Sequence, residues 1–112
     1  MDTSKKYIKM CDWTELQQKC TPYMENAFFR YNNKTIPIWL PSQDQWQEMI
    51  INCFPQQRID FIALALDFSD WIQGQTFEMR QYTESFTSME QLWMAFVMYK
   101  FHDKQWNGEK WN

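Results

Sequence analysis

The longest unbroken run of apolar residues in the chain extends from Leu92 to Tyr99. Ser88 and Gln91 precede it at the spacing of a capping box, in which a serine caps the first turn of a helix and a glutamine side chain reaches back. A helix that is apolar on all sides is normally buried on most of them. The run is too short for a membrane span, which needs about 20 apolar residues. This pattern predicts a core helix around which the rest of the chain packs.

A second helix is predicted after Pro41, where Ser42 and Gln45 repeat the capping-box spacing. Apolar residues then follow at i, i+3, i+4, i+7 and i+8, which places them on one face of a helix, and Pro55 ends the pattern. The residues on this face are Trp46, Met49, Ile50, Cys53 and Phe54.

The N-terminal segment predicts a helix that begins at Thr3 or Ser4 and ends near Lys19, with a break into two pieces at Trp13-Thr14. Two segments rich in aromatic and β-branched residues follow, on either side of Asn32-Asn33, and together they predict a β-hairpin. The second of them contains Pro37, which cannot donate to a strand ladder, so we expect a short or edge strand. The two segments are Asn26–Tyr31 and Thr35–Leu40.

Two further segments are less clear. Arg58–Ile72 is compatible with a buried helix or a buried strand, and its length and the glycine just after it, Gly74, favour the helix. Gln75–Phe86 shows no clear helical period, so we expect an extended segment or loop. The fold class predicted is mainly helical α+β, with about four helices around a central C-terminal helix and a short antiparallel hairpin, in one domain covering residues 1–112.

Composition narrows the classes of function. A hydrophobic share of 45% and an aromatic share of 19% exclude a disordered chain. The net charge is −3 and no basic run is longer than Lys5-Lys6, which argues against binding to nucleic-acid phosphates. The three cysteines lack CxxC spacing and the N-terminus lacks an apolar signal segment, so we expect reduced thiols in a cytoplasmic protein. We expect no cofactor and no metal.

Few residues are candidates for catalysis, metal binding or partner recognition. His102, the only histidine, is better explained as a helix-end residue interacting with the helix dipole than as part of a cysteine–histidine site. Trp106 and Trp111 flank an Asn-Gly turn and are either packed on the core or displayed as binding anchors. Three carboxylates can share one side of the third helix, as in acid–base or hard-metal sites, although a solvated face is the simpler explanation. These are Asp60, Asp67 and Asp70.

Four further stretches are notable: Tyr7–Met10, Trp39–Gln45, Ser88–Met98 and Trp106–Trp111. Together they resemble a family of small phage and prophage proteins of gut-associated Firmicutes. The C-terminal block is the most specific of them, whereas residues 11–35 depart from the family and Trp46 stands where a leucine is expected. The resemblance implies a phage genome and the cytoplasm of a bacterial host, and it implies no catalytic residue.

The function we expect is that of a non-enzymatic phage accessory protein that binds, and inhibits, a host protein, for example as an anti-CRISPR. One alternative is a ligand-sequestering protein that grips a small anion with arginines. Others are a structural or assembly protein of the phage, and an enzyme that uses the three aspartates. The arginines available for an anion are Arg30, Arg58 and Arg80.

The aromatic content also predicts a binding surface. A domain of this size has more large apolar side chains than one core can easily hide, and an exposed apolar patch usually marks an interaction site. The segments outside the family-like blocks fit this role best, and self-association can cover the patch when the partner is absent. The partner-binding residues we expect are Tyr23, Phe28 and Tyr31 at the hairpin, with Phe77, Met79 and Tyr82 in the segment before the core helix.

Overall fold

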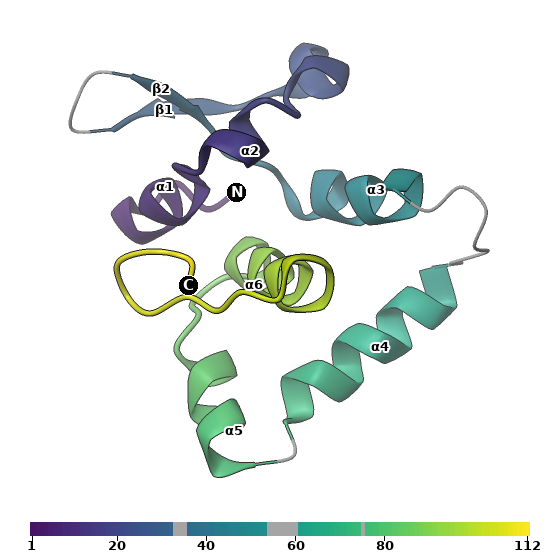
Figure 1. Cartoon of the computed structure of the whole chain (residues 1–112). Helices are drawn as coiled ribbons and strands as arrows, with labels where there is room; N and C mark the ends of the chain where they lie inside the picture. Colours follow the sequence, from purple (N-terminus) through teal and green to yellow (C-terminus); the bar gives the residue numbers. More distant parts are fainter. Residues whose placement is uncertain (33–35, 54–60, 75) are drawn as a thin grey trace.

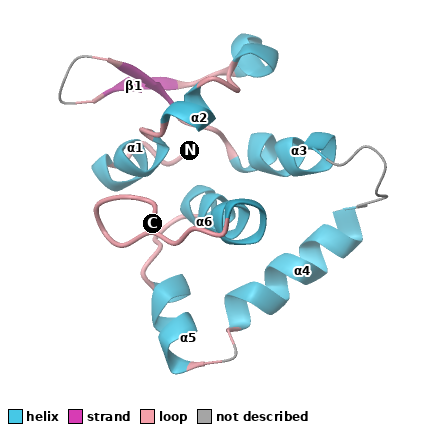
Figure 2. Ribbon diagram, viewed as in Figure 1, coloured by secondary structure: helices cyan, strands magenta, loops and turns pink. Residues whose placement is uncertain are grey.

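The structure, a computed structural model, describes residues 1–32, 36–53, 61–74 and 76–112. These residues form seven helices and one two-stranded antiparallel hairpin, which confirms the mainly helical α+β class (Figure 2). None of the helices described is long and apolar enough to cross a bilayer. In chain order the elements are α1 (Lys5–Cys11), α2 (Thr14–Gln17), η1 (Thr21–Asn26), β1 (Phe29–Tyr31), β2 (Pro37–Trp39), α3 (Gln43–Cys53), α4 (Phe61–Gln73), α5 (Phe77–Glu84) and α6 (Met89–His102).

The helix α6 is the centre of the fold, as its apolar run predicts. Figure 1 shows α1, the hairpin and α3 on one side of it and α4 and α5 on the other. The side chains from Trp93 to Met98 are all buried, because α6 has neighbours on both sides. The predicted break in the first helix also appears, since α1 ends at Cys11 and α2 begins at Thr14.

The two capping boxes differ in detail. At α3 the box is complete: the Gln45 amide donates to Ser42 Oγ at 3.2 Å, and the Ser42 amide donates to Gln45 Oε1 at 3.0 Å. At α6 the Gln91 amide donates to Ser88 Oγ at 3.1 Å, but the Gln91 side chain accepts from the Thr87 amide instead of the Ser88 amide. Its Nε2 is then free to donate to the Asp2 carboxylate, at 2.7 Å. The chain's N-terminal segment is thereby fixed to the start of α6.

The expectation of an extended segment or loop before α6 was wrong, because residues 77–84 form helix α5. Thr76 caps it by accepting from the Met79 amide at 3.2 Å. The packed residues of this segment do follow a helical period, at i, i+3, i+4 and i+7. One of these positions is Thr83, a polar residue that a search for apolar residues passes over. The aromatic Phe77 lies off that stripe and is 71% exposed, so counting aromatic residues alone hides the period. The packed residues are Met79, Tyr82, Thr83 and Phe86.

The helical interpretation of the segment before Gly74 is confirmed by α4. Over residues 63–73 of this helix, the buried residues are Leu64, Phe68 and Trp71, at i, i+4 and i+7. Gly74 follows the helix with a φ of +60°, a conformation that residues with a Cβ rarely adopt. This turn leads the chain from α4 towards α5.

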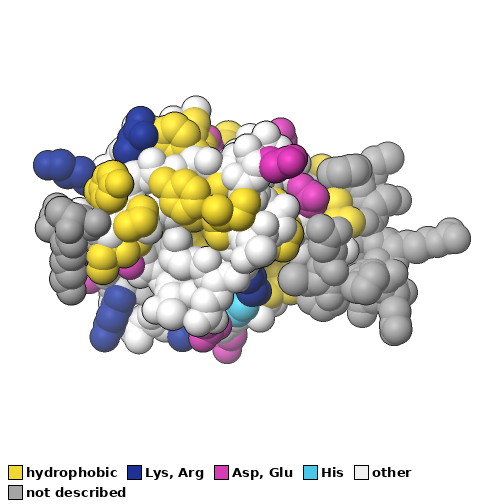
Figure 3. Space-filling model, turned by 90° about the horizontal axis from the view of Figure 1, so that it is seen from above, with side chains coloured by type: hydrophobic (Ala, Val, Ile, Leu, Met, Phe, Trp, Pro, Cys, Tyr) yellow, Lys and Arg dark blue, Asp and Glu magenta, His cyan; other side chains and the backbone are white. Residues whose placement is uncertain are grey.

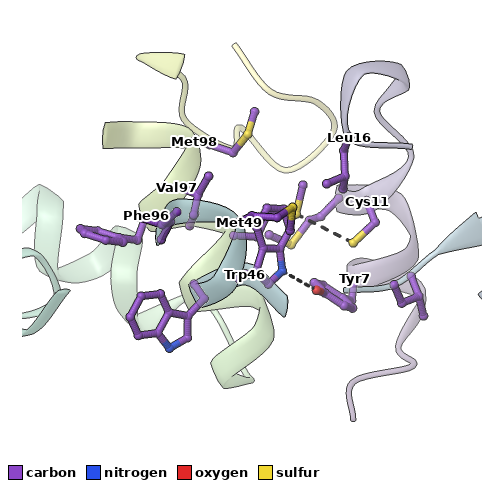
Figure 4. Packing of buried hydrophobic residues seen from close by; sticks show 14 of the residues in the cluster. Tyr7, Cys11, Leu16, Trp46, Met49, Phe96, Val97 and Met98 are labelled. Atoms are coloured by element: carbon purple, nitrogen blue, oxygen red, sulfur yellow. Dashed lines mark hydrogen bonds between the residues drawn. The ribbon is translucent and has the colours of Figure 1, made fainter. Parts of the chain in front are cut away.

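Polar contacts hold the N-terminal side of the core together. The Tyr7 hydroxyl of α1 donates to the Pro41 carbonyl at 2.5 Å and accepts from Trp46 Nε1 of α3 at 2.9 Å (Figure 4). Near the C-terminal end, Trp111 Nε1 donates to the Met10 carbonyl at 2.9 Å. Trp106 and Trp111 form an antiparallel bridge and Trp106 is buried. Of the two alternatives for this pair, packing on the core is therefore confirmed.

Candidate binding surfaces

The first candidate site lies over the hairpin and η1. Figure 3 looks down on this side of the molecule and shows hydrophobic side chains running across it. Tyr31 is 70% exposed and Met24 58%, and both are large apolar side chains of the kind that interfaces bury. We call the set the hairpin surface: Met24, Phe29, Tyr31 and Ile36.

The strand register places exposed and buried aromatic rings on one face of the hairpin, since Phe29 and Tyr31 are exposed whereas Trp39 is fully buried. Phe29 lies opposite Trp39 and Tyr31 opposite Pro37, so these pairs share one face of the hairpin. Arg30 lies opposite Ile38 on the other face, where Ile38 is buried.

The two edges of the hairpin differ. On the outer edge of β2, the Trp39 amide donates to Gln17 Oε1 at 2.8 Å and the Trp39 carbonyl accepts from Gln17 Nε2 at 3.1 Å. The outer edge of β1 carries the backbone groups of Phe29 and Tyr31, and no other described strand pairs with it. An unpaired strand edge is a template on which an extended segment of another chain can add a strand.

The other two predicted hairpin residues, Tyr23 and Phe28, are only partly exposed and pack against neighbouring side chains. The Tyr23 ring stacks on Trp39, with centroids 5.4 Å apart and planes at 18°. The Phe28 ring is half-buried, and the guanidinium of Arg30 lies 4.3 Å from its centroid. Of the three predicted hairpin residues, only Tyr31 is fully displayed.

The predicted residues of the second segment lie elsewhere, because α5 is at the opposite end of the molecule from the hairpin (Figure 1). Phe77 is exposed, whereas Met79 is half-buried against the core. The Tyr82 hydroxyl accepts from the Trp106 amide at 2.9 Å, and burial raises the pKa of this phenol. The six predicted residues therefore fall into two separate groups.

A second candidate site, which the sequence did not suggest, is a cavity of about 210 Å³ between α2, α3 and α6. Its polar lining residues are Lys19 and His102, and the His102 and Trp13 rings form a T-shaped contact at a centroid distance of 5.1 Å. Residues from three separate segments form it, so no local spacing reveals it. The apolar stripe on α3 predicted a packed core face. Trp46, Met49 and Ile50 of that stripe are buried in the core as predicted, and they also line the cavity. The apolar walls are Leu16, Trp46, Met49, Ile50, Val97 and Phe101.

Charged groups around the cavity act on His102. Burial lowers the pKa of its imidazole, the Lys19 ammonium lowers it further, and Lys104 adds to this effect. The Glu15 carboxylate opposes these effects by raising it. The ring is therefore neutral at pH 7, because its pKa lies below the ordinary value of about 6.5.

The remaining candidates from the sequence gain no support from the described residues. Asp67 forms an ion pair with Lys100 of α6, Asp70 is exposed, and Asp60 lies outside the described residues. Among the residues described, no group of three histidine, cysteine or acidic side chains is placed to hold a metal ion. Cys11 is fully buried, and burial raises the pKa of its thiol well above the ordinary value.

The three arginines considered for an anion do not converge either. Arg30 is on the hairpin and Arg80 is on α5, at the opposite end of the molecule (Figure 1). Arg58 lies outside the described residues. The arginine form of the ligand-sequestering alternative therefore gains no support from the described geometry.

Comparison with known proteins adds no relative. The chain matches no known protein family, no curated protein sequence and no solved structure. The resemblance to phage proteins therefore stays a prediction.

Proposed function

We propose that the protein is a non-enzymatic binding protein that holds a partner protein on the hairpin surface. The observation that carries the proposal is the combination of outward-facing apolar side chains with the open edge of β1. The partner chemistry that fits is an extended segment that pairs with β1 and places apolar side chains against Phe29 and Tyr31. Following the resemblance to phage proteins, the partner is a host protein whose activity this contact inhibits, as an anti-CRISPR would.

The asymmetry of the hairpin supports the choice of β1 over β2. Gln17 occupies the backbone groups of Trp39, so a segment approaching β2 would have to displace it. On β1 the Phe29 carbonyl accepts from Arg30 Nη1 at 3.2 Å, a contact made by an exposed side chain of the same strand. Main-chain pairing on β1 would provide affinity, and the alternate side chains would provide specificity.

The test compares two equally exposed aromatic residues, Tyr31 at 70% and Phe77 at 71%. The tagged wild-type chain, Tyr31→Glu and Phe77→Glu are incubated with lysate of a gut-associated Firmicute, and the captured proteins are identified by mass spectrometry. The captured protein is then purified, and its Kd for each variant is measured. We expect Tyr31→Glu to weaken binding at least about tenfold and Phe77→Glu to leave it unchanged.

Equal binding by wild type and Tyr31→Glu would overturn the proposal, as would capture of no protein that binds after purification. Light scattering at several concentrations separates a further outcome. A wild-type dimer that Tyr31→Glu converts to a monomer would show that the occupant of the hairpin surface is a second copy of this chain, not a host protein.

A further inference from the structure

We propose that the cavity between α2, α3 and α6 is a binding site for a small carboxylic acid with one aromatic ring. The ring would lie among the apolar walls, and the carboxylate would meet Lys19 and His102. The cavity shares no residue with the hairpin surface, so the two proposals are tested independently.

The size of the cavity restricts the ligand. A cavity of about 150 Å³ lined by apolar side chains is enough to bind benzene. Sites for drug-sized ligands and cofactors usually occupy roughly 300–1,000 Å³. At about 210 Å³, this cavity has room for one ring and a short polar group, and it is too small for a nucleotide.

The walls favour an apolar ligand body. Most of the lining side chains are apolar, and Leu16, Trp46 and Ile50 are among them. The one polar atom of the Trp46 side chain is already bonded to the Tyr7 hydroxyl, so this indole offers the cavity only an apolar surface. Figure 4 shows Leu16, Met49 and Val97 around this part of the core, coming from three different elements.

The polar side of the cavity favours an anion. Among the described residues, neither the Lys19 ammonium nor the ring nitrogens of His102 have a hydrogen-bond or ion-pair partner, although both side chains line the cavity. The charged groups that act on His102 are the cations Lys19 and Lys104, against the single carboxylate of Glu15. A ligand carboxylate would give both lining residues a partner, and charge-assisted hydrogen bonds are about twice as strong as neutral ones.

This arrangement has a consequence for pH. The free protein keeps His102 neutral, since burial and the two lysines lower its pKa. A bound carboxylate would favour the charged imidazolium and raise that pKa, so that binding takes up a proton. Affinity should therefore rise as the pH falls from neutral towards the lowered pKa of His102, as long as the ligand carboxylate stays ionised.

The experiment titrates phenylacetate into the ¹⁵N-labelled protein and follows the signals of Trp13, Trp46 and His102 by NMR. Phenylethanol, which has the ring without the charge, and acetate, which has the charge without the ring, are the comparison ligands. We expect saturable shifts with phenylacetate, with a Kd on the order of 1 mM or tighter, and weaker binding of both comparison ligands.

Lys19→Gln is the decisive variant, because Lys19 is exposed and its loss leaves the core intact. We expect it to weaken phenylacetate binding by roughly fivefold or more and to leave phenylethanol binding unchanged. Lys104→Gln is the matched control, since Lys104 is near His102 without lining the cavity, and its effect should be smaller.

Two results would overturn the proposal. One is the absence of saturable shifts up to about 20 mM phenylacetate, a concentration well above the expected Kd. The other is equal binding of phenylacetate and phenylethanol that Lys19→Gln does not change, which would show an apolar cavity without anion recognition.

Discussion

The two sides of α6 are held by different kinds of contact. On the side of α1 and α3, buried polar atoms fix the packing: one hydroxyl, that of Tyr7, connects Trp46 Nε1 and the Pro41 carbonyl. On the side of α4, the buried contacts are between rings, with an ion pair of Asp67 and Lys100 at the surface. Phe68 stacks on Trp93 at a centroid distance of 4.0 Å, and Phe96 meets both rings edge-on.

The stacked side leaves polar atoms unpaired. Trp71 Nε1 and Trp93 Nε1 are buried there without a hydrogen-bond partner among the residues that the structure describes, whereas on the other side Trp46 Nε1 and Trp111 Nε1 are both bonded. Trp39 Nε1 is also buried and unpaired, although the backbone of the same residue is bonded to Gln17. Hydrogen bonds fix orientation atom by atom, while stacked rings contribute mainly through buried area. The comparison therefore predicts different responses to substitution on the two sides.

The largest effect is expected on the stacked side. Trp93→Ala and Phe96→Ala should each lower the free energy of unfolding by about 3–5 kcal/mol, because each removes a buried ring and leaves a cavity. Chemical denaturation measures the loss, and Phe77→Ala is the control, since its exposed ring should change stability by less than about 0.5 kcal/mol. Losses below about 1 kcal/mol for both core variants would show that α6 is not the centre of the fold.

A smaller loss is expected on the bonded side from Tyr7→Phe. The substitution keeps the ring and removes one oxygen, so that Trp46 Nε1 and the Pro41 carbonyl both lose their partner. We expect a loss of about 1–3 kcal/mol, the usual effect of leaving a buried polar group unsatisfied. Tyr31→Phe, on an exposed tyrosine, is the control. If the two substitutions cost the same, the polar contacts do not fix this side.

The helix caps come next. Ser42→Ala and Ser88→Ala should each cost about 1 kcal/mol, through loss of the bond to the amide three residues on. Ser88 Oγ also donates to the Asp2 carboxylate at 2.5 Å, so its loss should additionally loosen the N-terminal segment. Thermal melts followed by circular dichroism measure the first effect, and hydrogen exchange at residues 2–4 the second. Melts that match the wild type would show that neither serine stabilises its helix.

The smallest effect is a dependence on pH. Partial burial raises the pKa of Asp2, but hydrogen bonds from Ser88, Ser4 and Gln91 outweigh it, so the folded pKa is lower than the unfolded one. The stability that Asp2 contributes is therefore complete above the unfolded pKa of about 3.9 and is lost as the pH falls through the folded pKa. Denaturation at pH 6 and near pH 3 should show a smaller acid-induced loss for Asp2→Asn than for the wild type. Identical losses would contradict this role.

Some elements could be predicted because their signals are local. The starts of α3 and α6 follow from a serine and a glutamine three residues apart, and their burial from apolar periodicity. Helix α5 was missed because one position of its packed stripe is a threonine, Thr83, whereas the aromatic Phe77 lies off the stripe and is exposed. The cavity, and the distance between the hairpin and α5, depend on how segments far apart in the chain pack, and the sequence contains no local signal for either.

The position of α6 along the chain bears on how the protein folds during its synthesis. Every helix and strand that packs against α6 precedes it, and Asp2 contacts Gln91 across 89 positions. During translation, which adds roughly 5–20 residues per second, the earlier elements therefore emerge before the helix that completes their core. Their rings remain exposed to water for that interval, so a chaperone that shields apolar segments should associate mainly with chains from which α6 has not yet emerged.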